Sequence, residues 1–181
     1  MLTFGIVVCV LFLWAIWTFN RLIRQRNGLK EAWSGIDVQL RRRHDLIPSI
    51  VACVEGYRAH EKSLLENVTA SRAAAATVHE AGASSPVENE VSKGLRQLFA
   101  VAENYPELKA DANFRKLADQ LVEIEDQIQY ARRYYNGSAR DMNNLVESIP
   151  SNIIASLVGF KTVAFFECES SLERATPTVS L

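Results

Sequence analysis

Residues 114–149 read FRKLADQLVEIEDQIQYARRYYNGSARDMNNLVESI. Apolar or small side chains recur here at alternating steps of three and four residues, which places them on one stripe of an α-helix. They are Phe114, Leu117, Leu121, Ile124, Ile128, Ala131, Tyr135, Ser138, Met142, Leu145 and Ile149. The helix would be about 55 Å long, and Pro150 ends it because proline cannot continue the helical hydrogen bonding. A helix of this length with one apolar stripe needs partner helices, so the sequence predicts an all-α bundle.

Composition narrows the class of protein. The chain has 181 residues, of which 48% are hydrophobic, and this suits one globular or membrane-associated domain. Its formal net charge of −1 provides no global field for nucleic acid, which we do not expect as a partner. Cys9, Cys53 and Cys168 are widely spaced, which disfavours a disulfide framework or a zinc knuckle and fits a reducing compartment.

The N-terminal stretch predicts a membrane anchor over residues 1–23. Residues 2–19 carry no charge, and with the next apolar positions they reach the roughly 20 residues that cross a hydrocarbon core. Trp14, Trp17 and Phe19 gather at its end, as an interfacial aromatic belt does. A cleaved signal peptide is the competing interpretation, but the stretch lacks a basic leading region and an Ala-x-Ala site.

Four basic residues follow the apolar stretch at once: Arg21, Arg24, Arg26 and Lys30. By the positive-inside rule they leave the N-terminus outside and the rest of the chain in the cytoplasm. The same four side chains are candidate contacts for lipid headgroups, each worth about 1 kcal/mol near an anionic surface. A role in topology alone is the simpler alternative.

A second striped helix is predicted over residues 29–57, and the membrane helix can run straight into it, because Gly28 is the only Gly or Pro between Phe19 and Leu29. Arg43 falls on its apolar stripe, so this side chain must either extend outward or pair internally. Pro48 predicts a bend, or a short break near Asp45. Asp37, Arg41 and Asp45 follow one another at i, i+4 and i+8, and with nearby Trp33 they form a candidate interaction face. The alternative is a solvated or inter-helix charge ladder.

The other elements follow from breakers and caps. Residues 60–76 and 87–102 read as helices, separated by a loop at 80–86 that is rich in Gly, Ser and Pro. Asp111 or Asn113 is the expected N-cap of the long helix. After Pro150 we expect a short helix over 153–160, an apolar segment 163–166 packed on the bundle, and a disordered tail over 169–181.

Polar residues beside the apolar stripe of the long helix are expected to fix how the helices align, and not to take part in catalysis. Tyr135, Asn136 and Asn143 are expected to fix helix register through hydrogen bonds. Glu123, Glu125 and Asp126 lie off the stripe and read as a solvated acidic face. The three histidines, His44, His60 and His79, lack the spacing of a metal site. We therefore expect no catalytic residue, no metal and no cofactor, and no enzymatic activity.

Five motifs together resemble the LemA family. They are RNGLKEAWSGIDVQLRRRHDLIPSIV, EGYRAHE, ENYPELKADANF, ARRYYN and SIPSNIIASLVGFK, in the family's order and spanning nearly the whole chain. The resemblance implies a bacterial membrane protein with one N-terminal transmembrane helix and a long antiparallel bundle of three to four main helices, here residues 24–168. It also implies no established enzymatic activity, and the family includes a member tied to magnetosome membrane formation. Met142, Ile149 and Ser49 depart from the expected aromatic, aromatic and Asn residues.

These features together predict a single-pass scaffold of the bacterial inner membrane. Its cytoplasmic bundle would organise other membrane or cytoplasmic proteins, or copies of itself. Membrane remodelling or vesicle formation by an oligomer is the alternative, and a metal-dependent enzyme is a third hypothesis of lower standing.

Overall fold

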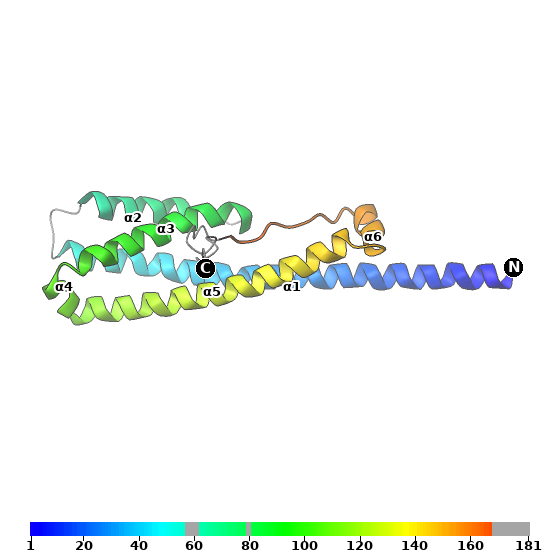
Figure 1. Ribbon diagram of the computed structural model, residues 1–181, viewed down its shortest axis with the longest axis horizontal. Helices are drawn as coiled ribbons and strands as arrows, with labels where there is room; N and C mark the ends of the chain where they lie inside the picture. Colours follow the sequence, from blue (N-terminus) through cyan, green and yellow to red (C-terminus); the bar gives the residue numbers. More distant parts are fainter. Residues whose placement is uncertain (57–61, 79–80, 168–181) are drawn as a thin grey trace, which may run out of the picture. The chain divides into compact units, whose positions relative to one another are not determined.

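The computed structural model describes residues 1–56, 62–78 and 81–167, and within these ranges it contains helices and no strands (Figure 1). The helices are α1 (Leu2–Glu55), α2 (Lys62–Ala75), α3 (Ala81–Ala102), α4 (Pro106–Ala110), α5 (Ala112–Glu147) and α6 (Ser151–Val158). The predicted all-α fold is confirmed. The expected tail, and the positions of His60, His79 and Cys168, lie outside the described residues.

The chain forms two compact units. The first unit comprises Met1–Gln39 and Asp126–Phe165, and the second comprises Leu40–Glu125 and the C-terminal residues from Phe166. Helices α1 and α5 each contribute residues to both units.

Helix α1 begins with the apolar stretch and is, within the described ranges, the one helix long and apolar enough to cross a membrane. Large apolar side chains in that stretch are exposed, Phe4 at 72% and Phe12 at 65% among them. A core helix of a soluble protein would bury such side chains, whereas a bilayer offers them an apolar solvent. Both observations indicate membrane anchoring.

Of the two outcomes predicted for Pro48, the short break near Asp45 is wrong, because α1 continues through Pro48 to Glu55, and the bend stays a prediction. Proline at this position has no N–H to donate to the carbonyl of His44, four residues earlier. In the structure the Nε of Arg72, from α2, donates to that carbonyl at 2.9 Å. The guanidinium thus satisfies the acceptor that proline leaves open, and the helix continues.

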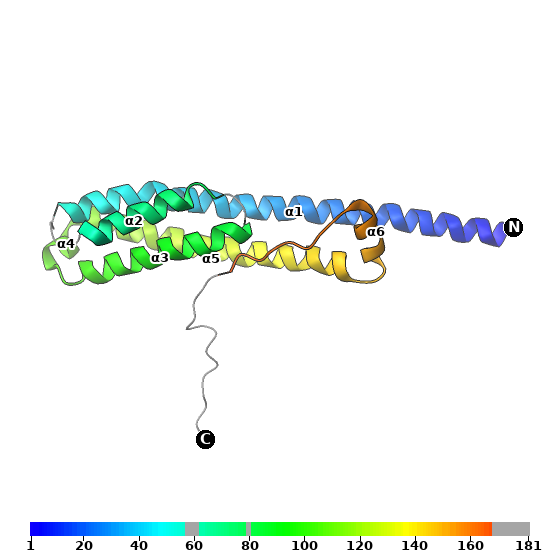
Figure 2. The same ribbon diagram turned by 90° about the horizontal axis from the view of Figure 1, so that it is seen from above.

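The second unit is built around one apolar core to which α1, α2, α3, α4 and α5 all contribute. Its largest fully buried side chains include Ile47, Ile50, Val68, Val91, Leu98 and Leu108. Helices α2 and α3 lie side by side (Figure 2) and approach closely at Gly94. A Cβ added there would lie 3.1 Å from Cγ2 of Val68, so the absence of a side chain permits this spacing.

The loop predicted over residues 80–86 is also wrong, because α3 already begins at Ala81 and includes Pro86. The small side chains that indicated a loop are used for packing: Ser84 is 1% exposed and Ser85 is 6% exposed. The hydroxyl of Ser84 donates to the carbonyl of Val78, just before the helix, at 3.2 Å. Burial of this first part of α3 outweighs its weak intrinsic helix propensity.

Asp111 begins the long helix as predicted. Its Oδ1 accepts hydrogen bonds from the backbone N–H groups of Asn113 at 2.8 Å and Phe114 at 2.9 Å. Two of the four N–H groups left open at a helix start are thereby satisfied. The helix ends at Glu147, two residues before the predicted end.

The first unit packs α6 beside α1 and the end of α5. Leu22, Met142, Leu145 and Ala155 form its buried cluster, with Val163 packed against them. Helix α6 starts and ends two residues earlier than predicted, and Gly159 ends it in the left-handed conformation, φ 79°. This conformation is strained for any residue with a Cβ, so glycine suits the position.

Replacing Asp111 with Ala is expected to destabilise the second unit by about 1 kcal/mol, because two helix-start N–H groups lose their acceptor. The measurement is denaturant unfolding of the full chain in detergent, followed by circular dichroism. Asp111→Asn, which keeps a side-chain acceptor, is the control and should lose much less. Equal losses in the two variants would show that the carboxylate charge, and not the cap, matters.

Candidate functional site

A buried charge cluster lies within the second unit, centred on Arg43. This side chain is 1% exposed and pairs internally, which settles the choice that the sequence left open. Its Nη1 donates to Oε1 of Glu125 on α5 at 2.7 Å and to Oγ of Ser92 on α3 at 2.8 Å. Its Nη2 donates to a carboxylate oxygen of Glu88 on α3. One guanidinium therefore bridges α1, α3 and α5.

Glu88 is the buried acid of the cluster, 5% exposed. Besides Arg43, it contacts the ring of His44, whose Nε2 lies 3.1 Å from Oε1. Burial is the largest single influence and raises the pKa of Glu88, but the hydrogen bonds and charges of His44 and Arg43 together lower it by more. The pKa of this carboxyl group consequently lies below its usual value, and Glu88 is ionised near neutral pH.

Glu125 is the outer acid of the cluster. Its side chain is 32% exposed, so water screens its pairing with Arg43 more than that of Glu88. The prediction of a purely solvated acidic face is thus wrong for Glu125. Since a residue next to the apolar stripe can reach across to a neighbouring helix, its position off the stripe did not exclude a buried partner.

The chemistry of the cluster is mutual neutralisation. One permanent cation faces two carboxylates, and Arg72 adds its contact to the backbone of His44. Nε of Arg43 has no hydrogen-bond partner in the described part of the chain. Over residues 1–56, 62–78 and 81–167 the structure also groups no three His, Cys, Asp or Glu side chains that could hold a metal ion. The arrangement holds helices together through paired charges.

The predicted interaction face occupies one helix but lies in both units, so its residues are described separately. In the first unit Trp33 is half-buried and packs edge-on against Tyr135, with ring centroids 5.7 Å apart and planes at 64°; Asp37 is also half-buried. In the second unit Arg41 and Asp45 are exposed. Asp45 borders a polar cleft of about 320 Å³ that Glu123 also lines. The proposed role of this face remains a prediction.

Two of the three predicted register residues bind the segment that follows α6. Asn143 donates from Nδ2 to the carbonyl of Val163 at 3.0 Å and accepts from its N–H at 2.8 Å. The hydroxyl of Tyr135 donates to the carbonyl of Ala164 at 3.0 Å, and burial raises the pKa of this phenol. Asn136 is half-buried. These bonds join α5 to an irregular segment instead of to a helix.

The four predicted headgroup contacts, Arg21, Arg24, Arg26 and Lys30, are all exposed. Arg21 lies over the ring of Trp17, 5.5 Å from its centroid, and Arg26 lies 5.4 Å from that of Phe160. Cation–π contacts of this kind hold a guanidinium in place while it remains available to an anion.

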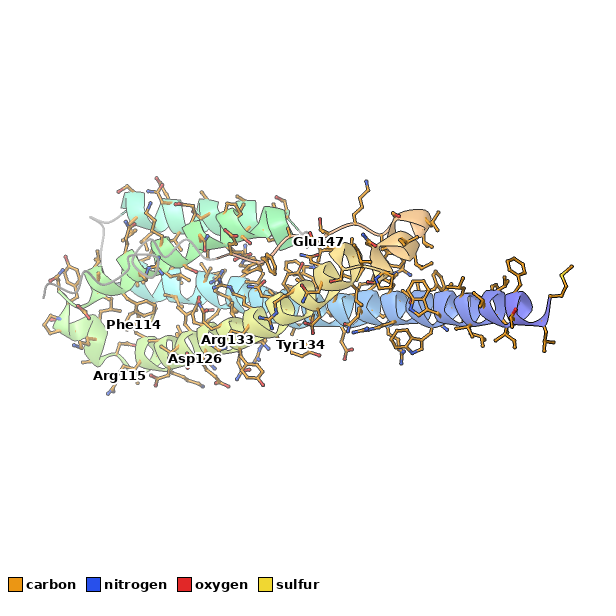
Figure 3. All side chains as sticks on the ribbon, turned by 45° about the vertical axis from the view of Figure 1, so that its right-hand side comes forward. Phe114, Arg115, Asp126, Arg133, Tyr134 and Glu147 are labelled. Carbon is orange, nitrogen blue, oxygen red and sulfur yellow. The ribbon has the colours of Figure 1, made fainter. Side chains whose placement is uncertain are left out.

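Sequence reasoning missed Glu88, although a signal for it was present. Glu88 precedes Val91 and Leu95 by three and seven residues, which places it on the apolar stripe of α3. An acidic residue on the apolar stripe of α3 and a basic residue on that of α1 would have predicted the pair Glu88–Arg43. Exposed aromatic side chains on α5 were also missed: Tyr130 is 66% exposed, and Tyr134, labelled in Figure 3, is 59% exposed.

Comparison with known proteins places this fold in a family. The model of the LemA family matches residues 32–181. The chain belongs to the LemA family. Protein LemA of Metamycoplasma hominis is 27% identical over 157 residues, which cover 86% of this chain and 71% of that protein.

Magnetosome proteins are also similar to this LemA-family chain. MamQ of Magnetospirillum gryphiswaldense is 22% identical over 177 residues, and MamQ 2 of Paramagnetospirillum magneticum is 22% identical over 178 residues. Each match covers 82% of this chain and 64% of the magnetosome protein. This chain therefore spans less than two thirds of their length.

Replacing Glu88 with Ala is expected to destabilise the protein by about 3–5 kcal/mol, because it removes the buried partner of Arg43. Denaturant unfolding of the full chain in detergent measures the loss. The control is Glu90→Ala, which removes an exposed carboxylate 3.8 Å from Lys93 and should change stability by less than about 1 kcal/mol. Arg43→Met combined with Glu88→Leu should recover much of the stability, and a still larger loss in that double variant would contradict the argument.

The lowered pKa of Glu88 predicts a loss of stability in acid. Its contribution is complete above the ordinary carboxyl pKa of about 4.3, where Glu88 is ionised in both the folded and the unfolded state. It declines as the pH falls below that value and through the lower folded pKa, because the unfolded state then binds the proton first. Between about pH 6 and about pH 3.5 the thermal unfolding temperature should fall less for Glu88→Gln than for the native chain. Equal differences would exclude Glu88 as a source of the pH dependence.

Proposed function

We propose that this LemA-family protein is a single-pass, membrane-anchored helical scaffold of the bacterial inner membrane. The observation that carries the proposal is the continuity of α1. One helix, Leu2–Glu55, contains both the apolar stretch and the two residues, Arg43 and His44, that begin the charge cluster. The apolar stretch is therefore part of a helix whose later residues belong to a folded core, as suits a membrane-anchored helical protein.

Charge distribution supports a cytoplasmic location for the residues after the anchor. The basic residues Arg21, Arg24, Arg26 and Lys30 directly follow the apolar stretch. Basic residues near a membrane segment are retained on the cytoplasmic side. We therefore place the N-terminus outside.

A non-catalytic role is part of the proposal. The buried charged groups Arg43 and Glu88 are engaged with each other, and Arg43 also binds Ser92 on α3 and Glu125 on α5. Charges used in this way specify how helices pair and contribute no free nucleophile or base. The partners we propose are the lipid bilayer, other membrane or cytoplasmic proteins, and further copies of the chain.

A second candidate function is membrane remodelling by an oligomer. The similarity to the magnetosome proteins MamQ and MamQ 2 favours it, at 22% identity in each case. Native electrophoresis after gentle detergent extraction distinguishes the two functions. A ladder or a single large species supports remodelling by assembly, and a monomer alone excludes it.

The interaction surface is tested by Arg41→Glu. We propose that Arg41 and Asp45 contact a protein partner, so reversing this exposed charge should lower recovery of co-purified partners severalfold while leaving the membrane level unchanged. Affinity purification from membranes with quantitative mass spectrometry measures the recovery. Lys93→Glu, which reverses a 60%-exposed charge on α3, is the matched control. Unchanged partners in Arg41→Glu, or equal losses in both variants, would exclude this surface.

A further inference from the structure

Helix α6 exposes an apolar face. Leu157 is 77% exposed and Ile153 is 54% exposed, and Ile149, just before the helix, is 83% exposed. The step of four residues places Ile153 and Leu157 on one side of α6, and Ile149 adds an exposed apolar side chain in the turn before the helix. The opposite side contributes Ala155, 0% exposed, to the buried cluster of the first unit. An apolar face of this kind needs an apolar surrounding.

The position of α6 identifies that surrounding. Ala155 shares its cluster with Leu22, so α6 packs on α1 where the apolar stretch ends (Figure 1). The turn that precedes α6 shares a cleft with Trp14 and Thr18. These residues lie about 8–14 Å along the helix axis inside residue 23, the end of the predicted anchor. Amphipathic helices at a membrane surface bury their apolar face about 5–10 Å into the headgroup boundary, which is a comparable depth.

The cleft itself combines polar and apolar groups. It measures about 450 Å³, and its lining includes Trp14, Trp17, Thr18 and Arg21 from α1 and Asp141 and Ser148 from the α5–α6 region. All of these residues belong to the first unit. Arg21 is the cation of this lining and Asp141 its carboxylate.

One lining group is an unsatisfied polar atom. Thr18 is 2% exposed, and its Oγ1 has no hydrogen-bond partner in the described part of the chain. A buried hydroxyl without a partner costs free energy, so a polar ligand atom in the cleft would stabilise it. Ser148 and Ser151 add hydroxyl groups to the same wall.

We propose that this cleft binds the headgroup of a phospholipid that carries both a phosphate and an amine, as phosphatidylethanolamine does, with α6 embedded in the membrane interface. The phosphate lies at Arg21, which the ring of Trp17 holds in place, and the ammonium lies at Asp141. The acyl chains continue along Trp14 and the apolar face of α6. This inference rests on the membrane anchor of the proposed function, but holds for either orientation of the chain.

A lipid occupant is favoured over a protein occupant because α6 packs at the end of the predicted membrane-spanning stretch. Ala155 packs α6 on Leu22, at the end of the exposed apolar stretch of α1, so one bilayer would cover that stretch and the outward apolar face of α6 together. The tryptophans at the cleft also have the amphipathic character of residues at the headgroup level.

The depth of α6 is tested with a fluorescent label in the full chain. Ile153→Cys is labelled with an environment-sensitive dye in a background of Cys9→Ser, Cys53→Ser and Cys168→Ser, and reconstituted in vesicles of phosphatidylethanolamine and phosphatidylglycerol. Brominated acyl chains should quench this label at least about twofold more than a label at Tyr134→Cys, a 59%-exposed position on α5 in the same unit.

Two results would overturn the embedded position. Equal quenching at both sites would place α6 in water, and a label shielded from brominated lipid and aqueous iodide alike would show a protein covering α6. Failure of the chain to float with the vesicles would instead contradict the membrane anchor, so the two proposals fail separately.

The headgroup site is tested by native mass spectrometry of the full chain with added phosphatidylethanolamine or phosphatidylglycerol. Arg21→Gln should lower binding of phosphatidylethanolamine about fivefold, since a basic residue near a headgroup is worth about 1 kcal/mol. Arg24→Gln is the matched control, because Arg24 is exposed on α1 but does not line the cleft. Asp141→Asn should remove the preference for phosphatidylethanolamine over phosphatidylglycerol. Equal effects of the two arginine variants, or no preference in the native chain, would overturn the site.

Discussion

The second unit depends on the pairing of one buried guanidinium. Arg43 stands where an apolar side chain would complete the stripe of α1, and a lone charge in that position would be prohibitively costly. Glu88 and Glu125 offset this cost, and they come from two different helices. The requirement to bring both carboxylates to one cation restricts how α1, α3 and α5 pack far more than apolar contacts, which tolerate sliding, would.

The residues next to Arg43 in α1 make further contacts with α2 and α3. Pro48 leaves the carbonyl of His44 without a helical donor, and Arg72 of α2 supplies one at 2.9 Å. The ring of His44 faces Glu88, so the residue next to Arg43 supports the same carboxylate. Paired buried charges need not stabilise a fold more than apolar residues would, and their best-attested use is to specify a unique pairing. The scaffold role that we propose would require such uniqueness.

The first unit contains the apolar stretch of α1, and different contacts hold it together. Its polar contacts are made between α5 and the segment after α6, through Tyr135 and Asn143. Those bonds hold the segment after α6 on α5, while α6 itself packs beside Leu22. Helix α6 thus packs where the apolar stretch of α1 ends, and its outward side leaves Ile153 and Leu157 exposed.

The sequence by itself determined the local elements: the helices from their steps of three and four residues, the anchor from its apolar run, and the cap at Asp111 from residue type. These signals lie within a few turns of chain, so periodicity and propensity suffice. Only the tertiary structure decided that Arg43 pairs with Glu88 and Glu125, which are 45 and 82 residues away, and that Arg72 lets α1 continue past Pro48. It also decided that the Ser- and Pro-containing start of α3 is helical, because its serines are buried. Such contacts join residues distant in sequence, and burial on a neighbouring helix outweighs the local preference of the chain.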